Sequence, residues 1–359
     1  MNAFSSPADA LRAARRLMLA LLLAGAWSAP AAELSDQQVL DIVTSEDARD
    51  RAIRRALAFL RSQSQPDHGM PGGPRGALTG LALIAHLAAG VTPEDPEHGA
   101  WIRHGLEFIL GLQSANGYLG EKDASRMYGH GIMTLCLAEA LGMSRDDDLE
   151  ERLTLALTRA VAVTINAAQI TKAPAHEGGW RYLPGDAGAD LSLSGWQLMS
   201  LHATQQVGVP VPEAVILAAV AYAKRLTSAD GRVGYESPGQ DNPSLRGLSM
   251  LSLSIGGQGD APEVAAVTQR ILADPIKWQG QWFFYRAYYD AVGMSRAAPA
   301  AWDGYSRQLE QVLVERQNPD GTWSPPPGNN EGDYGPIYMT SMGVLALAVQ
   351  RHVLPAYQR

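Results

Sequence analysis

A corner that recurs along the chain constrains its fold more than any other feature of the sequence. Helix-like stretches end in Gln or a polar residue, and a Gly with a neighbouring aromatic residue follows. The clearest copies are Gln63 before His68-Gly69, Gln113 before Gly117-Tyr118, and Gln317 before Gly321-Thr322-Trp323. Weaker copies are Gln169 before Gly178-Gly179-Trp180, Asp230-Gly231 before Gly234-Tyr235, and Trp278 to Trp282. Because self-similarity at a fixed period indicates a repeat architecture, these corners predict six repeats.

Each corner separates two helical stretches of different character. The first stretch carries more charge, and the second is richer in small and apolar residues, which predicts an outer helix covering an inner one. The predicted outer helices are 46–63, 96–113, 149–169, 211–227, 261–273 and 300–317. The predicted inner helices are 77–89, 129–141, 192–207, 243–255, 282–292 and 337–353. A period of about 45 to 55 residues fits paired helices better than strands.

The ends of these helices carry the expected signals, and the pairs have a way to close on themselves. Acidic residues 146–148 open an outer helix, while Gly90, Gly142 and Gly293 are predicted to stop inner helices. The last inner helix is strongly apolar, so it suits a buried, ring-closing position better than a solvated cap. The sequence therefore predicts an all-α fold, an (α/α)6 toroid of six helical hairpins.

The segment from Gln317 to Trp323 resembles the repeat of the α/α-toroid superfamily, which includes squalene and oxidosqualene cyclases and protein prenyltransferase β subunits. The resemblance covers residues 46–359. Residues 178–182, 190–197 and 354–359 look like exported bacterial members of that group. Such a resemblance implies the toroid fold, whereas function has to be argued from a site.

Residues 1–32 read as a secretory signal peptide, leaving residues 33–359 as one toroid domain. Arg12, Arg15 and Arg16 precede an apolar run over residues 17–26, and small residues follow, so cleavage is expected after Ala31 or Ala32. The alternative is a retained anchor. The pattern predicts a periplasmic or secreted protein without a transmembrane segment once the signal is removed.

Composition disfavours several partners. The formal net charge is −8 and Lys and Arg form no basic stripe, so nucleic acid is not expected as a partner. Cys136 is the single cysteine, which excludes an intramolecular disulfide and a thiolate metal cluster.

The chemistry of the resembled families is not reproduced in these residues. Prenyltransferase β subunits hold zinc with Asp, Cys and His, but Cys136 lies in an apolar helical stretch, so neither zinc nor any other cofactor is expected. Squalene-type cyclases use an acid in an Asp-x-Asp-Asp motif, and the nearest counterpart in this sequence is the lone Asp190. Asp190 is either the N-cap of an inner helix or a catalytic acid. His130 is either a packing histidine or its acid–base partner.

Polar and aromatic residues near the starts of the inner helices are the candidates for lining a central cavity. The ligand-binding candidates are Tyr128, Trp196, Gln197, Arg246, Trp282, Tyr285, Tyr288 and Tyr338. Three functions remain open: a binding module for a hydrophobic small molecule, a glycan or a peptide segment; a terpene cyclase-like or polysaccharide-cleaving enzyme using Asp190 and His130; and an envelope interaction scaffold.

Overall fold

The computed structural model describes residues 47–351, 353 and 354 of the 359-residue chain. The chain divides into two units, Met1–Arg51 and Ala52–Arg359, and the second contains nearly all of the described residues. The predicted signal peptide, residues 1–32, lies outside the described residues. In the second unit, the described residues form helices and three isolated β-bridges.

The predicted helical hairpins are present, and most helix ends lie within a few residues of the prediction. The outer helices are α3 (Ala48–Ser62), α5 (Gly99–Leu112), α7 (Asp147–Gln169), α9 (Glu213–Leu226), α11 (Pro262–Ala273) and α13 (Pro299–Arg316). The inner helices are α4 (Arg75–Ala88), α6 (Arg126–Met143), α8 (Leu191–Gln206), α10 (Arg246–Ile255), α12 (Phe283–Ala297) and α14 (Gly335–Ala348). Short 3₁₀ helices precede α10 (Pro243–Leu245) and α14 (Glu331–Tyr334) and follow α14 (Val349–Arg351).

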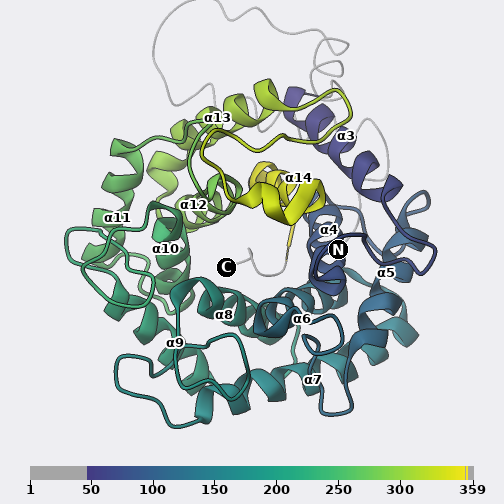
Figure 1. Cartoon of the computed structure of the whole chain (residues 1–359), viewed down its shortest axis with the longest axis horizontal. Coiled ribbons are helices and arrows are strands. Elements are labelled where there is room, and N and C mark those ends of the chain that lie inside the picture. The colour runs from purple at the N-terminus through teal and green to yellow at the C-terminus, as the bar shows by residue number, and fades with distance from the viewer. Residues whose placement is uncertain (1–46, 352, 355–359) are drawn as a thin grey trace, which may run out of the picture. The chain divides into compact units, whose positions relative to one another are not determined.

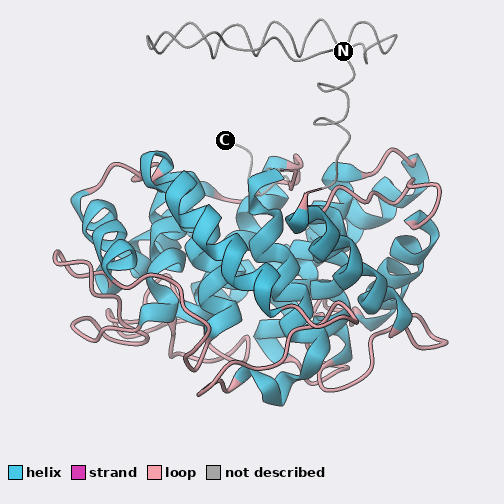
Figure 2. Ribbon diagram, turned by 90° about the horizontal axis from the view of Figure 1, so that it is seen from above, coloured by secondary structure: helices cyan, strands magenta, loops and turns pink. Residues whose placement is uncertain are grey.

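The inner helices close into a ring. Each packs against the next in chain order, and α14 packs against both α12 and α4, so the last hairpin meets the first (Figure 1). The outer helices lie around this ring and cover the inner helices. The predicted α/α toroid is confirmed. The longer connections, which lead from outer to inner helices, gather along the lower edge of Figure 2.

Two of the corner glutamines, Gln113 and Gln317, tie their outer helix to the one that follows. The Gln113 side chain donates from Nε2 to the carbonyl oxygens of Gly117, 3.1 Å away, and Ala156 on α7, 2.9 Å away. Gln317 does the same with Gly321 at 3.0 Å and Ala52 on α3 at 2.8 Å. This pair of hydrogen bonds, which we call the Gln317 clasp, joins the last outer helix to the first and so helps to close the ring.

The corner glycines allow the same junctions a close backbone approach. Four of them have φ between +80° and +92°, and a Cβ at each would lie 2.1–2.5 Å from a backbone oxygen of the next outer helix. The pairs are Gly117 with Arg159, Gly178 with Ala218, Gly231 with Ala266, and Gly321 with Arg55. Only glycine combines this backbone conformation with so little space.

Of the three glycines predicted to stop inner helices, only one does so. Gly90 follows α4 with φ +89°, as expected, but the predictions for Gly142 and Gly293 are wrong, since Gly142 lies inside α6 and Gly293 inside α12. Gly293 serves packing instead, because a Cβ there would lie 2.4 Å from the Gly247 carbonyl oxygen of α10. A Cβ at Gly247 would in turn lie 2.2 Å from the Tyr289 backbone. These glycines bring α10 and α12 into backbone contact.

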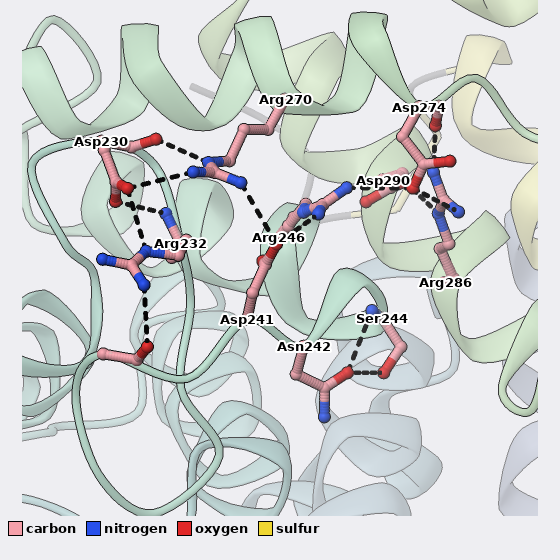
Figure 3. A network of polar contacts seen from close by, with 11 residues as sticks. Asp230, Arg232, Asp241, Asn242, Ser244, Arg246, Arg270, Asp274, Arg286 and Asp290 are labelled. Carbon is pink, nitrogen blue, oxygen red and sulfur yellow. Dashed lines mark hydrogen bonds and ion pairs between the residues drawn. The ribbon is translucent and has the colours of Figure 1, made fainter.

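A network of Arg and Asp side chains joins the ends of α10, α11 and α12 (Figure 3). Arg246, at the start of α10, pairs with Asp241 at 2.9 Å and Asp274 at 3.1 Å. Arg286 on α12 pairs with Asp274 at 3.2 Å and with the fully buried Asp290 at 3.1 Å. The network ties neighbouring hairpins together on the side of the long connections.

Candidate functional site

Tyrosines gather where the outer helices end and the inner helices begin. All six connections of this kind reach the same face of the ring, so residues far apart in sequence come together there. We define the tyrosine cluster as Tyr128, Tyr182, Ser192, Tyr235, Trp282, Tyr285, Tyr334 and Tyr338. These residues come from the starts of α6, α8, α12 and α14 and from the corners beside them.

A hydrogen-bonded chain crosses the ring within this cluster. Tyr128 on α6 donates from its hydroxyl to Ser192 Oγ on α8 over 2.8 Å. The Ser192 Oγ lies 2.9 Å from the Tyr285 hydroxyl on α12. Since α6 and α12 are not neighbours in the ring, the chain spans its interior and fixes both phenol rings.

Arg181 organises one side of the cluster. Its guanidinium lies over the ring of Tyr182, 4.6 Å from the centroid, and over that of Tyr235 at 5.8 Å. The two tyrosine hydroxyls are 3.3 Å apart. Arg181 also pairs with Asp190 at 2.9 Å and makes a close ion pair with Glu236. Its charge is therefore matched by two carboxylates.

Asp190 is a helix cap beneath the cluster. One carboxylate oxygen accepts from the Leu193 amide over 2.8 Å, and the other accepts from Arg181. The side chain is fully buried, and burial raises the pKa of Asp190 despite the Leu193 amide, the Arg181 charge and the Tyr235 hydroxyl, which act in the opposite sense. The geometry thus supplies the N-cap that was one of its two predicted roles.

Glu331 plays the corresponding part at the start of α12. Its two oxygens accept from the Phe284 and Tyr285 amides, each over 2.8 Å, and Asn329 and Tyr338 also donate to it. Burial raises the pKa of Glu331, and these four hydrogen bonds oppose that change. Carboxylates suit the exposed amides at a helix start. Glu331 therefore caps α12 and also fixes the Tyr338 hydroxyl.

Aromatic side chains of the cluster reach solvent. Tyr334 is half-exposed, at 50%, and stacks at a tilt on Tyr338 and Trp282, with centroid distances of 5.3 and 6.2 Å. Tyr128, Tyr182, Tyr235, Trp282 and Tyr338 are partly buried. Burial raises the pKa of Tyr128 and Tyr338 well above the ordinary value. The phenols are therefore neutral at physiological pH and can donate and accept hydrogen bonds.

Not every predicted site residue lies in this cluster. His130 is fully buried, accepts at Nδ1 from the Leu119 amide over 3.2 Å, and has Nε2 3.1 Å from the Ala160 carbonyl oxygen and the Thr164 hydroxyl. Burial lowers the pKa of His130 to about 4, against the opposing effect of the Ala160 hydrogen bond. Those contacts match the packing role that the sequence left open. Gln197 donates to the Met127 carbonyl oxygen and accepts from Thr164.

Three further candidates are also engaged elsewhere. Trp196 on α8 is 2% exposed and packs against Tyr288 and Tyr289 on α12, with centroid distances of 6.3 and 5.7 Å. Since both tyrosines are fully buried, these three aromatic side chains belong to the core between α8 and α12. Arg246 belongs to the Arg–Asp network. The tyrosine cluster therefore contains four predicted residues, Tyr128, Trp282, Tyr285 and Tyr338, of which Tyr285 is buried, together with newly found neighbours.

Five residues of this region were not predicted from the sequence: Tyr182, Ser192, Tyr235, Tyr334 and Glu331. A signal was present for most of them, since Tyr182 follows a repeat corner, Tyr235 belongs to one, and Glu331 and Tyr334 lie between the last corner and the last inner helix. Within the described residues, no three His, Cys, Asp or Glu side chains come together in a way that could hold a metal ion. Over the same part of the chain, no helix is long and apolar enough to cross a membrane.

Comparison with known proteins supports the fold. The type II terpene cyclase MstE from Scytonema, in a substituted form bound to geranylgeranyl dihydroxybenzoate, matches with TM-score 0.56 and 15% identity over 86% of this chain and 98% of its own. An α-amylase from Clostridium perfringens matches with TM-score 0.55 and 8% identity over 83% and 97%. A protein from Actinoplanes matches with TM-score 0.53 and 17% identity over 86% and 100%.

No family model matches this sequence, and no curated protein matches it. The structural matches span nearly the whole length of each of those proteins, so the likeness concerns the complete toroid. At these identities the likeness extends to the fold alone. The chain therefore shares the α/α-toroid fold of terpene cyclases, and its function has to be argued from the tyrosine cluster.

Proposed function

We propose that this chain is an exported binding protein whose tyrosine cluster holds an extended ligand at one face of the toroid. The observation that carries the proposal is the group of partly exposed aromatic side chains that internal hydrogen bonds already fix in place. Aromatic surface with a few convergent polar groups is the usual make-up of a ligand site. Rings held by Ser192 and Glu331 lose little further freedom on binding, which favours affinity.

Two of the structural neighbours are compatible with an extended ligand. The MstE structure contains geranylgeranyl dihydroxybenzoate, and the second neighbour is an α-amylase. A hydrophobic chain and a glycan therefore both remain within the proposal, as does a peptide segment. Export rests on the apolar run over residues 17–26 and the small residues after it.

Binding without conversion is favoured over catalysis by the state of the two catalytic candidates. Each oxygen of Asp190 already accepts a hydrogen bond, and both ring nitrogens of His130 face groups of the protein interior. A general acid or base needs to reach a substrate directly or through one water. Asp190 and His130 are better suited to holding the fold than to proton transfer.

Native mass spectrometry of the protein purified from its own cell envelope tests the proposal. We expect a co-purifying molecule on the wild-type protein and its loss from Tyr334→Ala and Trp282→Ala, because both substitutions remove accessible ring surface from the cluster. Trp302→Ala is the matched control, since Trp302 is also partly buried but lies on the outer helix α13. It should keep the bound molecule.

The same spectra test export, because a cleaved chain begins at Ala32 or Glu33. A mass that retains residues 1–32 would contradict the signal peptide. Equal ligand occupancy in Trp282→Ala and Trp302→Ala would contradict the assignment of the site.

A further inference from the structure

We infer that the ligand of the tyrosine cluster is a neutral oligosaccharide, bound by stacking of its pyranose rings and by hydrogen bonds to the phenols between them. This inference rests on the proposed function and narrows it to one class of ligand. Three features support it: the kind of aromatic residue present, the arrangement of the rings, and the distribution of charge.

The aromatic residues of the cluster all carry a polar atom. They are tyrosines and one tryptophan, whereas the phenylalanines next to them in sequence, Phe283 and Phe284, are buried in the core. The chain thus places Trp282 at the accessible face and the purely apolar rings beneath it, while Tyr285 is buried and directs its hydroxyl to Ser192. A hydrocarbon ligand would cover the hydrogen-bonding capacity that the phenol and indole groups have left without giving it partners, which is unfavourable. A sugar covers the same rings with C–H groups and offers hydroxyls to their edges.

The rings form two stacking positions with hydrogen-bonding groups between them. Trp282 and Tyr334 make one position, and Tyr128 and Tyr182, with centroids 6.1 Å apart, make the other. The Tyr285 hydroxyl belongs to the series of hydrogen bonds, Tyr128–Ser192–Tyr285, that lies between the two positions. The hydrogen bonds from Tyr128 through Ser192 to Tyr285 connect the second position to the start of α12, where Trp282 of the first position lies three residues before Tyr285. A chain of rings can therefore lie across both.

Carboxylates outnumber the cation in and around this cluster. Arg181, its cation, pairs with Asp190 and Glu236, and the carboxylates of Asp190 and Glu331 are buried beneath the rings as helix caps. A diphosphate or an acidic sugar would need a cation that is not already matched. This distribution of charge favours an uncharged ligand over a polyprenyl diphosphate or a polyuronate.

Calorimetric titration of the purified, signal-free protein tests this inference. The probes are cellohexaose, maltohexaose and chitohexaose, each beside its disaccharide, with geranylgeraniol in detergent micelles as the hydrocarbon. We expect at least one hexaose to bind, and to bind about tenfold or more tightly than its disaccharide, because only the longer chain covers both stacking positions. Titration with geranylgeraniol micelles should give no more heat of binding than titration with empty micelles.

Variants separate the ring surfaces from the overall fold. Tyr334→Ala and Tyr182→Ala, one in each stacking position, should each weaken hexaose binding by about tenfold. Trp302→Ala should bind the hexaose as the wild type does. Helical circular dichroism confirms that each variant is folded, and Tyr334→Phe, which keeps the ring, should retain most of the affinity.

The outcomes distinguish this inference from the proposed function. If geranylgeraniol binds while the hexaoses do not, the sugar inference is overturned and the proposed binding role stands. If neither class binds and the native spectra show no bound molecule, both are wrong. Hexaose binding that Tyr182→Ala and Tyr334→Ala leave unchanged would place the sugar elsewhere and would overturn the inference about this cluster.

Discussion

The clasp made by Gln317 gives a direct test of ring closure. Replacing Gln317 with Ala removes its hydrogen bonds of 2.8 and 3.0 Å to the carbonyl oxygens of Ala52 and Gly321. A net contribution of about 1 kcal/mol for each, with some further loss for carbonyls left without a donor, gives a destabilisation of about 2–3 kcal/mol. The contacts from Arg55 add little, because they are solvent-exposed.

Gln113 is the matched comparison within the same chain. Its Nε2 makes the equivalent pair of bonds, 2.9 Å to Ala156 and 3.1 Å to Gly117, at a junction between consecutive hairpins. Gln113→Ala should therefore cost the same as Gln317→Ala to within about 0.5 kcal/mol. Gln311→Ala serves as a control, because Gln311 is exposed and bonds to the exposed Glu315 one turn away, and it should change stability by less than about 0.5 kcal/mol.

Urea unfolding followed by helical circular dichroism measures all three variants. We expect Gln113→Ala and Gln317→Ala to lower the midpoint by similar amounts without changing the denaturant slope. A large loss for Gln113→Ala beside no loss for Gln317→Ala would mean that the first and last outer helices are not joined in solution. That result would refute the role of the Gln317 clasp in closing the ring.

Four more predictions use the same measurements of unfolding. Gly321→Ala should destabilise the fold by several kcal/mol, whereas Gly328→Ala should cost about 1 kcal/mol. Both glycines have positive φ, but only at Gly321 would a Cβ meet a neighbouring backbone. Equal losses would contradict this close approach. Gly304→Ala, in the exposed middle of α13 with open space around it, should stabilise the protein by about 0.5–1 kcal/mol; a loss would show an unseen contact. Burial lowers the pKa of His130 to about 4, below its value of about 6.5 in the unfolded chain. The folded state therefore favours the neutral imidazole, and the free energy of unfolding should fall as the pH drops from about 6.5 to 4. Burial raises the pKa of Asp290 to about 6, which acts in the opposite sense, so Asp290→Asn should make the acid-induced loss of stability steeper, and an unchanged slope would contradict that assignment.

The fold could be predicted because its signals are local and repeated. Gln, Gly and an aromatic residue recur at similar places in the clear corners, and their contacts lie within the corner, on the outer helix before it or on the next outer helix. The helix ends were harder to predict, since glycine has two uses. Gly90 ends a helix through its positive φ, while Gly293 lets two helices touch, and the sequence alone does not separate these roles.

The site was harder to predict because its contacts depend on ring closure. Tyr128, Ser192 and Tyr285 lie 64 and 93 positions apart along the chain and meet only when six hairpins bring their ends to one face. Glu331 reaches back 46 positions to cap α12, a role that no local pattern announces. Asp190 was predictable as a cap because it directly precedes the helix that it serves.

The closed order of the hairpins also affects how this protein should come apart. An open row of repeats can fray from its two ends, losing one unit at a time while the remainder stays folded. Here α14 packs on α4, and Gln317 bonds to α3, so every hairpin has two neighbours and none is terminal. Fraying has no starting point in such an arrangement, and unfolding should proceed as one cooperative event despite the repetitive architecture.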